Sequence, residues 1–229
     1  MIRRSLSTVA VSLLLAVAIA PASQARDLEP GEAQWVITPS DVKVAGAVND
    51  ESTNALGPTI PQACTSFSGQ GTADGRESLE TIIGSFATKS GASWQSSVWT
   101  YKTAAAARRS YDQLKQRSIA RCNDLFTGLI GDDEADMPAV QNQRSAVIPK
   151  SAAPRSRYQR FFAANTTMLL DPATARPGYQ DTFQYATFAL VGDAIVQVNL
   201  FQNTPVTPTQ RTSSVRALNA ISARYAASF

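Results

Sequence analysis

Trp94-Gln-Ser-Ser-Val-Trp-Thr-Tyr101 is the stretch that decides the fold, because its polar and apolar residues alternate as in a half-buried β-strand. After it, Thr103 offers a hydroxyl to the free amides of a new helix, and four alanines from Ala104 favour helical structure. One side of this helix is an apolar stripe of Ala104, Ala107, Tyr111, Leu114 and Cys122, and the other side carries Arg109, Asp112, Gln113 and Gln116. We therefore expect a strand followed by an amphipathic helix that packs on the rest of the protein.

The clearest hairpin lies around the two-residue turn Gly192-Asp193, whose glycine accepts the positive φ angle that such turns need. In this register the numbers of paired residues in the strands 182–191 and 194–202 add to 385. One face is almost wholly apolar and should be core: Phe183, Tyr185, Thr187, Ala189, Val196, Val198 and Leu200. The second face mixes apolar residues with amides: Gln184, Phe188, Leu190, Ile195, Gln197, Asn199 and Phe201. This mixed face suits either a solvated sheet surface or the wall of a cleft.

Weaker patterns complete the outline of the chain. Residues 79–88 and 93–101 are expected to be two strands around a turn at 89–92, with further strands at 144–148 and 158–170. Ser40 and Asp41 are expected to cap a short helix that runs through Val48. The composition of residues 49–61 predicts a loop.

A C-terminal helix should begin at Thr207, because Pro208 and Gln210 complete a capping box. Its apolar stripe runs to the end of the chain: Val215, Leu218, Ile221, Ser222, Tyr225 and Phe229. These elements predict an α+β fold, an antiparallel sheet with helices packed on it and a possible cleft. We expect a single domain at 35–229, preceded by a flexible segment at 26–34.

The first 25 residues have the composition of a secretory signal peptide. Arg3 and Arg4 precede an apolar run at 9–20, and Ser23-Gln-Ala25 supplies small residues for cleavage after Ala25. Removal of this segment leaves 19 basic and 18 acidic residues, so the mature chain has a net charge near +1. We therefore expect a secreted or extracytoplasmic protein with no transmembrane segment in the mature chain and no nucleic-acid partner.

Cys64 and Cys122 are the only cysteines in a chain expected to enter an oxidising compartment, so a disulfide is the default interpretation. The alternative is a free nucleophilic cysteine, which usually needs a histidine partner, and the chain has no histidine.

The lack of histidine also excludes Ser-His-Asp triads and most zinc sites, and no catalytic motif or cofactor site is found. We expect no cofactor and no enzymatic activity. Arg155, Arg157 and Arg160 could attract an anionic ligand, although arginines in a polar segment are usually part of the solvated surface.

Several segments resemble the PknH-like extracellular sensor domain family, which includes the sensor domain of a mycobacterial serine/threonine kinase and exported stand-alone relatives. The matching segments are Ile37-Thr-Pro-Ser-Asp-Val42, Pro61-Gln-Ala-Cys64, Trp94 to Tyr101, Arg121-Cys122 and Leu190-Val-Gly-Asp-Ala-Ile-Val196. The resemblance covers about residues 35–229. It implies an antiparallel sheet with helices that enclose a cleft for an unidentified ligand. Kinase-linked members typically have two disulfides, whereas this chain can form only one.

Our first functional hypothesis is an exported, monomeric, sensor-type domain that binds a small molecule or an envelope component. The predicted ligand-binding residues are Phe188 and Phe201, as apolar walls, and Gln197 and Asn199, as hydrogen-bonding groups. Two alternatives are an interaction module that docks on another envelope protein and a hydrolase that uses an Asp/Glu pair on glycans. An open, solvated mixed face would contradict the proposed site.

Overall fold

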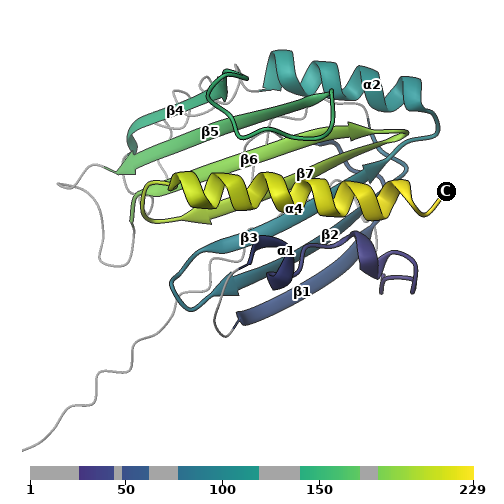
Figure 1. The fold of residues 1–229 in the computed structure, drawn as a ribbon, viewed down its shortest axis with the longest axis horizontal. Coiled ribbons are helices and arrows are strands. Elements are labelled where there is room, and N and C mark those ends of the chain that lie inside the picture. The colour runs from purple at the N-terminus through teal and green to yellow at the C-terminus, as the bar shows by residue number, and fades with distance from the viewer. Residues whose placement is uncertain (1–25, 44–47, 62–76, 119–139, 171–179) are drawn as a thin grey trace, which may run out of the picture.

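Seven antiparallel strands form one sheet in the order β1-β2-β3-β7-β6-β5-β4 (Figure 1). The structure is a computed structural model that describes residues 26–43, 48–61, 77–118, 140–170 and 180–229. The strands are β1 (Val48–Leu56), β2 (Glu80–Thr88), β3 (Ser93–Thr100), β4 (Val140–Ile148), β5 (Phe161–Leu170), β6 (Thr182–Val191) and β7 (Ala194–Gln202). The sheet thus consists of two meanders, β1–β3 and β4–β7, which are joined by pairing between β3 and β7. The predicted α+β class and antiparallel sheet are confirmed.

The β6–β7 hairpin has the predicted register, with Val191 opposite Ala194 and Phe183 opposite Gln202. Gly192 in its turn has a φ of 58°, a conformation that glycine adopts without strain. The two faces of the sheet are named after the helices that cover them. The α4 face includes Tyr185, Ala189, Val196, Val198 and Leu200, and the α2 face includes Phe188, Ile195, Gln197 and Asn199.

Helix α4 (Pro208–Ala226) lies along one face of the sheet (Figure 1). It starts with the predicted capping box, in which the Gln210 amide N–H donates to the Thr207 hydroxyl and the Thr207 amide N–H donates to the Gln210 side chain. Its inner side chains are buried with those of the α4 face: Val215, Ala217, Leu218, Ile221 and Tyr225. Phe229 was expected to extend this stripe but is 87% exposed, because the helix ends at Ala226.

Helix α2 (Ala104–Gln113) covers part of the opposite face and continues as a short π-helical segment, Leu114–Ser118. The Ala106 amide N–H donates to the Thr103 hydroxyl, as the sequence predicts. Ala107, Tyr111 and Leu114 are buried in a cluster with Trp99, Phe162, Phe188 and Ile195. Ala104 is exposed, contrary to the predicted stripe, because the first helical turn projects beyond this cluster.

The segment before β1 lies on the α4 face beside α4 and contains a 3-10 turn (Ala33–Trp35) and α1 (Pro39–Val42). Gly84 of β2 makes room for it, because a Cβ atom at Gly84 would lie 2.4 Å from the Cβ of Val36. The helix predicted from Ser40 through Val48 is wrong in both bounds. Thr38 is the N-cap and Pro39 the first helical residue, and the helix ends where Lys43 adopts a φ of 53°.

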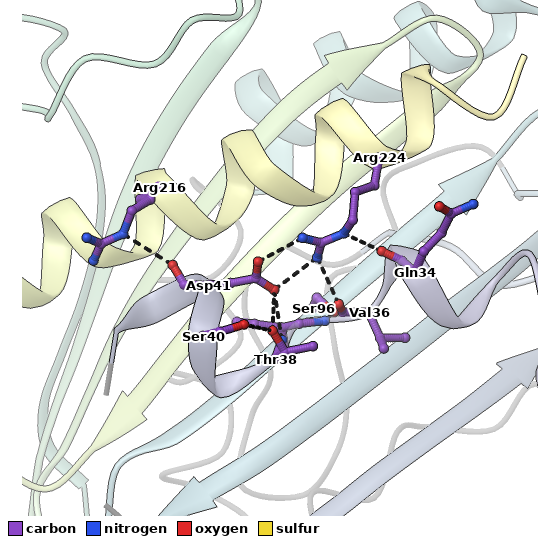
Figure 2. A network of polar contacts seen from close by, with 9 residues as sticks. Gln34, Val36, Thr38, Ser40, Asp41, Ser96, Arg216 and Arg224 are labelled. Atoms are coloured by element: carbon purple, nitrogen blue, oxygen red, sulfur yellow. Dashed lines mark hydrogen bonds and ion pairs between the residues drawn. The ribbon is translucent and has the colours of Figure 1, made fainter. Parts of the chain in front are cut away.

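Arg224 of α4 fixes this N-terminal segment to the helix (Figure 2). Its guanidinium donates to both carboxylate oxygens of Asp41, at 2.8 and 2.9 Å, and to the backbone carbonyls of Gln34 and Val36. Asp41 also accepts a hydrogen bond from the Thr38 amide N–H at 2.9 Å. Burial by itself would raise the pKa of Asp41, but the hydrogen bonds from Arg224 and Thr38 bring it below its usual value.

The predicted loop at 49–61 is wrong for residues 49–56, which belong to β1, an edge strand that pairs with β2, whereas residues 57–61 form neither a helix nor a strand. The sequence of β1 is polar, and its order comes from backbone pairing and contacts such as that between the hydroxyls of Ser52 and Ser85. In the segment 26–34, which was predicted to be flexible, Arg26 is bonded to Ala55 of β1: the backbone amides of these two residues donate to each other's carbonyls. Strands β4 and β5 confirm the predicted strands at 144–148 and 158–170, with β4 starting earlier.

Candidate functional site

Three amide side chains meet on the α2 face of strands β6 and β7. The side-chain N–H groups of Gln184 and Gln197 both donate to Asn199 Oδ1, at 3.3 and 3.1 Å. We call Gln184, Gln197 and Asn199 the amide cluster. All three are buried, with exposed fractions of 5%, 3% and 6%, so an open and solvated mixed face is excluded at these positions.

Two side-chain groups of Asn199 and Gln184 have no partner among the described residues. Asn199 uses only its oxygen in the cluster, so its NH2 group, which could donate two hydrogen bonds, has no partner there. The side-chain oxygen of Gln184 also lacks a partner in this part of the chain. Neither group is among the buried side-chain atoms that lack a hydrogen-bond partner, so each keeps contact with solvent. A ligand with a hydrogen-bond acceptor and a donor could therefore replace water at these two groups.

The described residues paired with the amide cluster are uncharged, and they are partly polar and partly apolar. Across the neighbouring strands, Gln184 pairs with Thr166 and Phe201, Gln197 with Ser97 and Phe188, and Asn199 with Gln95 and Ala186. The polar surface continues to β4 through a 2.9 Å hydrogen bond between the hydroxyls of Thr166 and Ser145. This electrostatic environment is suited to a neutral ligand with hydrogen-bonding groups.

An aromatic cluster borders the amides toward α2. Phe188 is stacked on Phe162, with ring centroids 4.5 Å apart, and Tyr111 of α2 packs edge-on against Phe162 at 5.4 Å. Phe188 is fully buried by these contacts, whereas Phe201, at the other end of the amides, is partly exposed. Of the two predicted apolar walls, Phe201 is therefore the one with surface left for a ligand.

The structure thus brings Gln197 and Asn199 together and places Phe188 and Phe201 on either side of them along the two strands. The prediction missed Gln184 as a member of the site. The register that adds to 385 could have identified it, because it puts Gln184 on the same face and diagonal to Asn199. The predicted disulfide residues Cys64 and Cys122 and the predicted signal peptide lie outside the described residues.

Two carboxylates share one arginine at the edge of the sheet, which bears on the alternative of a glycan hydrolase. Arg26 forms ion pairs with Glu32, at 2.6 Å, and with Glu80. The hydrogen bond from Arg26 lowers the pKa of Glu32, whereas a carboxyl that protonates a glycosidic oxygen needs a raised pKa. Glu32 therefore lacks the raised pKa that the general acid of the hydrolase hypothesis requires.

Two hollows of about 340 Å³ each lie away from the amide cluster. One lies between residues 154–157 and α4, and the other is on the outer strands β4 and β5, beside Arg144, Asn165 and Thr167. Within the described ranges, no His, Cys, Asp or Glu side chains form a group that could hold a metal ion. Among the helices in the same ranges, none has both the length and the apolar character needed to cross a membrane.

Comparison with known proteins gives similarity at the level of structure. No protein-family model matches the chain, and no curated protein matches it. The structure is similar to the extracellular domain of PknH from Mycobacterium tuberculosis, with 11% identity, a TM-score of 0.47, and coverage of 87% of this chain and 98% of that chain. It is also similar to an uncharacterised protein, the Rv0999 ortholog, from Mycobacterium smegmatis, with 9% identity, a TM-score of 0.40, and coverage of 81% and 97%. The first of these is the domain that the sequence motifs resemble.

Proposed function

We propose that this protein is an exported, non-catalytic domain of the sensor type, which binds a small molecule or a component of the cell envelope. The observation that carries the proposal is the amide cluster, because Asn199 accepts two hydrogen bonds while its own NH2 group has no partner among the described residues. Export is supported by the composition of residues 1–25, and the sensor role by the sequence motifs shared with PknH-like extracellular domains.

The ligand that fits this site is neutral, with an edge that both accepts and donates hydrogen bonds. The NH2 group of Asn199 would donate to it, and the side-chain oxygen of Gln184 would accept from it. Phe201 would supply an apolar contact at one end. Sugar hydroxyls and amide groups have this chemistry. A charged ligand does not fit, because the residues paired with the amide cluster carry no charge to neutralise it.

The test is native mass spectrometry of the protein purified from its own host, followed by the same measurement on two variants. We expect the wild type to retain a small molecule. Asn199→Leu should bind this molecule about tenfold more weakly, because a lost buried hydrogen bond costs about 1–3 kcal/mol. Asn54→Leu is the matched control, because Asn54 is exposed on the edge strand β1 of the same sheet.

Thermal unfolding separates ligand binding from a purely structural role of Asn199. The wild type should unfold at a lower temperature after the retained molecule is stripped and should recover when it is returned, because a ligand stabilises the state that binds it. Asn199→Leu should show little of this shift, and Asn54→Leu should show all of it. Wild-type protein with nothing retained, or equal retention by Asn199→Leu, would contradict the proposal.

A further inference from the structure

A groove of about 340 Å³ separates residues 154–157, in the connection between β4 and β5, from helix α4. Its charged lining is Arg155, Arg157 and Arg216, and no acidic side chain contributes to it. Val215, Ala220 and Ala223 of α4 give it an apolar floor. The groove lies on the α4 side of the sheet, opposite the amide cluster, so an inference about it does not depend on the proposed function.

The β4–β5 connection is held against α4 by Asn219. The Ser156 hydroxyl donates to Asn219 Oδ1 at 2.8 Å, and the Arg157 amide N–H donates to the same oxygen at 3.3 Å. The Tyr158 amide N–H donates to the Ser156 hydroxyl at 3.2 Å, which fixes the connection one residue further. These contacts fix the backbone that carries the two exposed arginines, and they leave the NH2 group of Asn219 without a partner among the described residues.

None of the three arginines is neutralised by a carboxylate in the described part of the chain. Arg155 and Arg157 make no side-chain hydrogen bond or ion pair there. Arg216 donates to the backbone carbonyls of Asp41 and Val42, at 3.2 Å each, and to the Ser213 hydroxyl at 2.8 Å. Its guanidinium is thus held in position by neutral acceptors. Arg160, by contrast, is 3.5 Å from Asp112. The groove therefore keeps three positive charges, one of them already fixed.

We propose that this groove binds a small molecule that carries a phosphate group. Guanidinium groups form paired, charge-assisted hydrogen bonds to phosphate oxygens, and three of them suit a doubly charged phosphate monoester better than a singly charged carboxylate. The NH2 group of Asn219 adds a neutral donor. The volume is at the lower end of the range for small-molecule sites, and the apolar floor can receive the organic part of the ligand.

The experiment is a ¹H–¹⁵N NMR titration of the purified protein with phenyl phosphate, inorganic phosphate and benzoate at constant ionic strength. We expect saturable shifts in the amides of residues 154–158 and 212–223, with phenyl phosphate binding more tightly than inorganic phosphate and benzoate more weakly than both. Chemical-shift changes that grow linearly with phenyl phosphate concentration and do not saturate would overturn the assignment. Benzoate binding as tightly as phenyl phosphate would also overturn it.

Variants decide whether the binding is specific to the groove. The double variant with Arg155→Gln and Arg157→Gln should bind phenyl phosphate about tenfold more weakly or worse, because hydrogen bonds between charged groups are among the strongest that a side chain makes. Arg108→Gln with Arg109→Gln is the matched control, because both arginines are exposed on α2 and the change in net charge is the same. Equal weakening by the two double variants would mean non-specific attraction and would overturn the proposal.

Asn219→Asp provides an independent check. An aspartate can still accept the bonds from Ser156 and Arg157, so the connection should stay in place. The new negative charge in the groove should abolish phenyl phosphate binding while the remaining amide spectrum stays close to that of the wild type. Undiminished binding by this variant would place the ligand elsewhere and overturn the proposal.

Discussion

Asp41 and Arg224 are separated by 183 residues in the sequence and form a doubly hydrogen-bonded ion pair in the structure. The Asp41 carboxylate is largely buried, so its charge is stable there only because Arg224 and Thr38 donate to it. No local pattern in the sequence predicts this pair. The sequence indicates only a local role for Asp41, as the cap of a short helix, and Arg224 is outside the apolar stripe predicted for the last helix.

We predict that Asp41→Asn lowers the free energy of unfolding at pH 7 by about 1–3 kcal/mol, because an amide cannot accept from Arg224 and Thr38 with both oxygens. The pKa of Asp41 in the folded protein lies below its value of about 3.9 in the unfolded chain. Its charged form therefore contributes stability above about pH 4, and this contribution is lost as the pH falls through the folded pKa. Urea unfolding of both proteins at pH 7 and pH 3 measures this.

The stability difference between wild type and Asp41→Asn should thus be smaller at pH 3 than at pH 7. Asp112→Asn is the control, because the Asp112–Arg160 pair is exposed, and its loss should cost less than about 1 kcal/mol. An equal difference at both pH values would show that Asp41 is not stabilised as a carboxylate.

At the scale of single elements, helix α2 and the π-helical residue Leu114 that follows it contact the sheet through one side of the helix only. Tyr111 and Leu114 are buried with Phe162 and Phe188 of the sheet, whereas Arg109 points away from this cluster and is exposed. The alanine-rich first turn supplies helix propensity, and the cluster at the other end of the helix supplies tertiary contacts.

We predict that Leu114→Ala lowers the free energy of unfolding by about 2–5 kcal/mol, as expected for a fully buried leucine. Arg109→Ala should change it by less than about 0.5 kcal/mol, because the arginine is exposed and has no partner among the described residues. Chemical denaturation of the two variants compares them directly. Similar midpoints would mean that α2 does not rest on the sheet through Leu114.

Elements with a local signal could be predicted from the sequence, and those that depend on distant partners could not. The β6–β7 hairpin and the starts of α2 and α4 follow from a turn, a cap and short-range periodicity. Strand β1 has a polar sequence and is ordered by pairing with β2, so its composition resembles that of a loop. For the amide cluster, the sequence predicted the mixed face and the residues Gln197 and Asn199. It did not predict the hydrogen bond from Gln184 to Asn199, because this bond depends on side-chain conformation.

At the scale of the whole molecule, the sheet joins two meanders, and the described part of the chain links them in more than one way. Strands β3 and β7 pair directly, and α4 lies over β6 and β7 while Arg224 and Arg216 hold the segment that precedes β1. The two candidate sites lie on opposite faces of this sheet. The amides of the α2 face suit a neutral ligand, and the arginines beside α4 suit an anion, so one site can be altered without changing the other.

The predicted disulfide between Cys64 and Cys122 would link distant parts of the whole molecule. Cys64 occurs in the connection from β1 to β2, and Cys122 in the connection from α2 to β4, so a bond between them would tie the first meander to the segment that leads into the second. We predict that thiol titration of the purified protein, denatured without reductant, finds no free sulfhydryl, and that prior reduction reveals two. The bond would close a loop of roughly 58 residues, worth about 4 kcal/mol in the chain-entropy model, so reduction should also lower the midpoint of urea unfolding. Cys64→Ser with Cys122→Ser should match the reduced wild type in this midpoint, because both have lost the same covalent link. Two reactive thiols without reductant would contradict the bond and, with it, one physical link between the halves of the sheet.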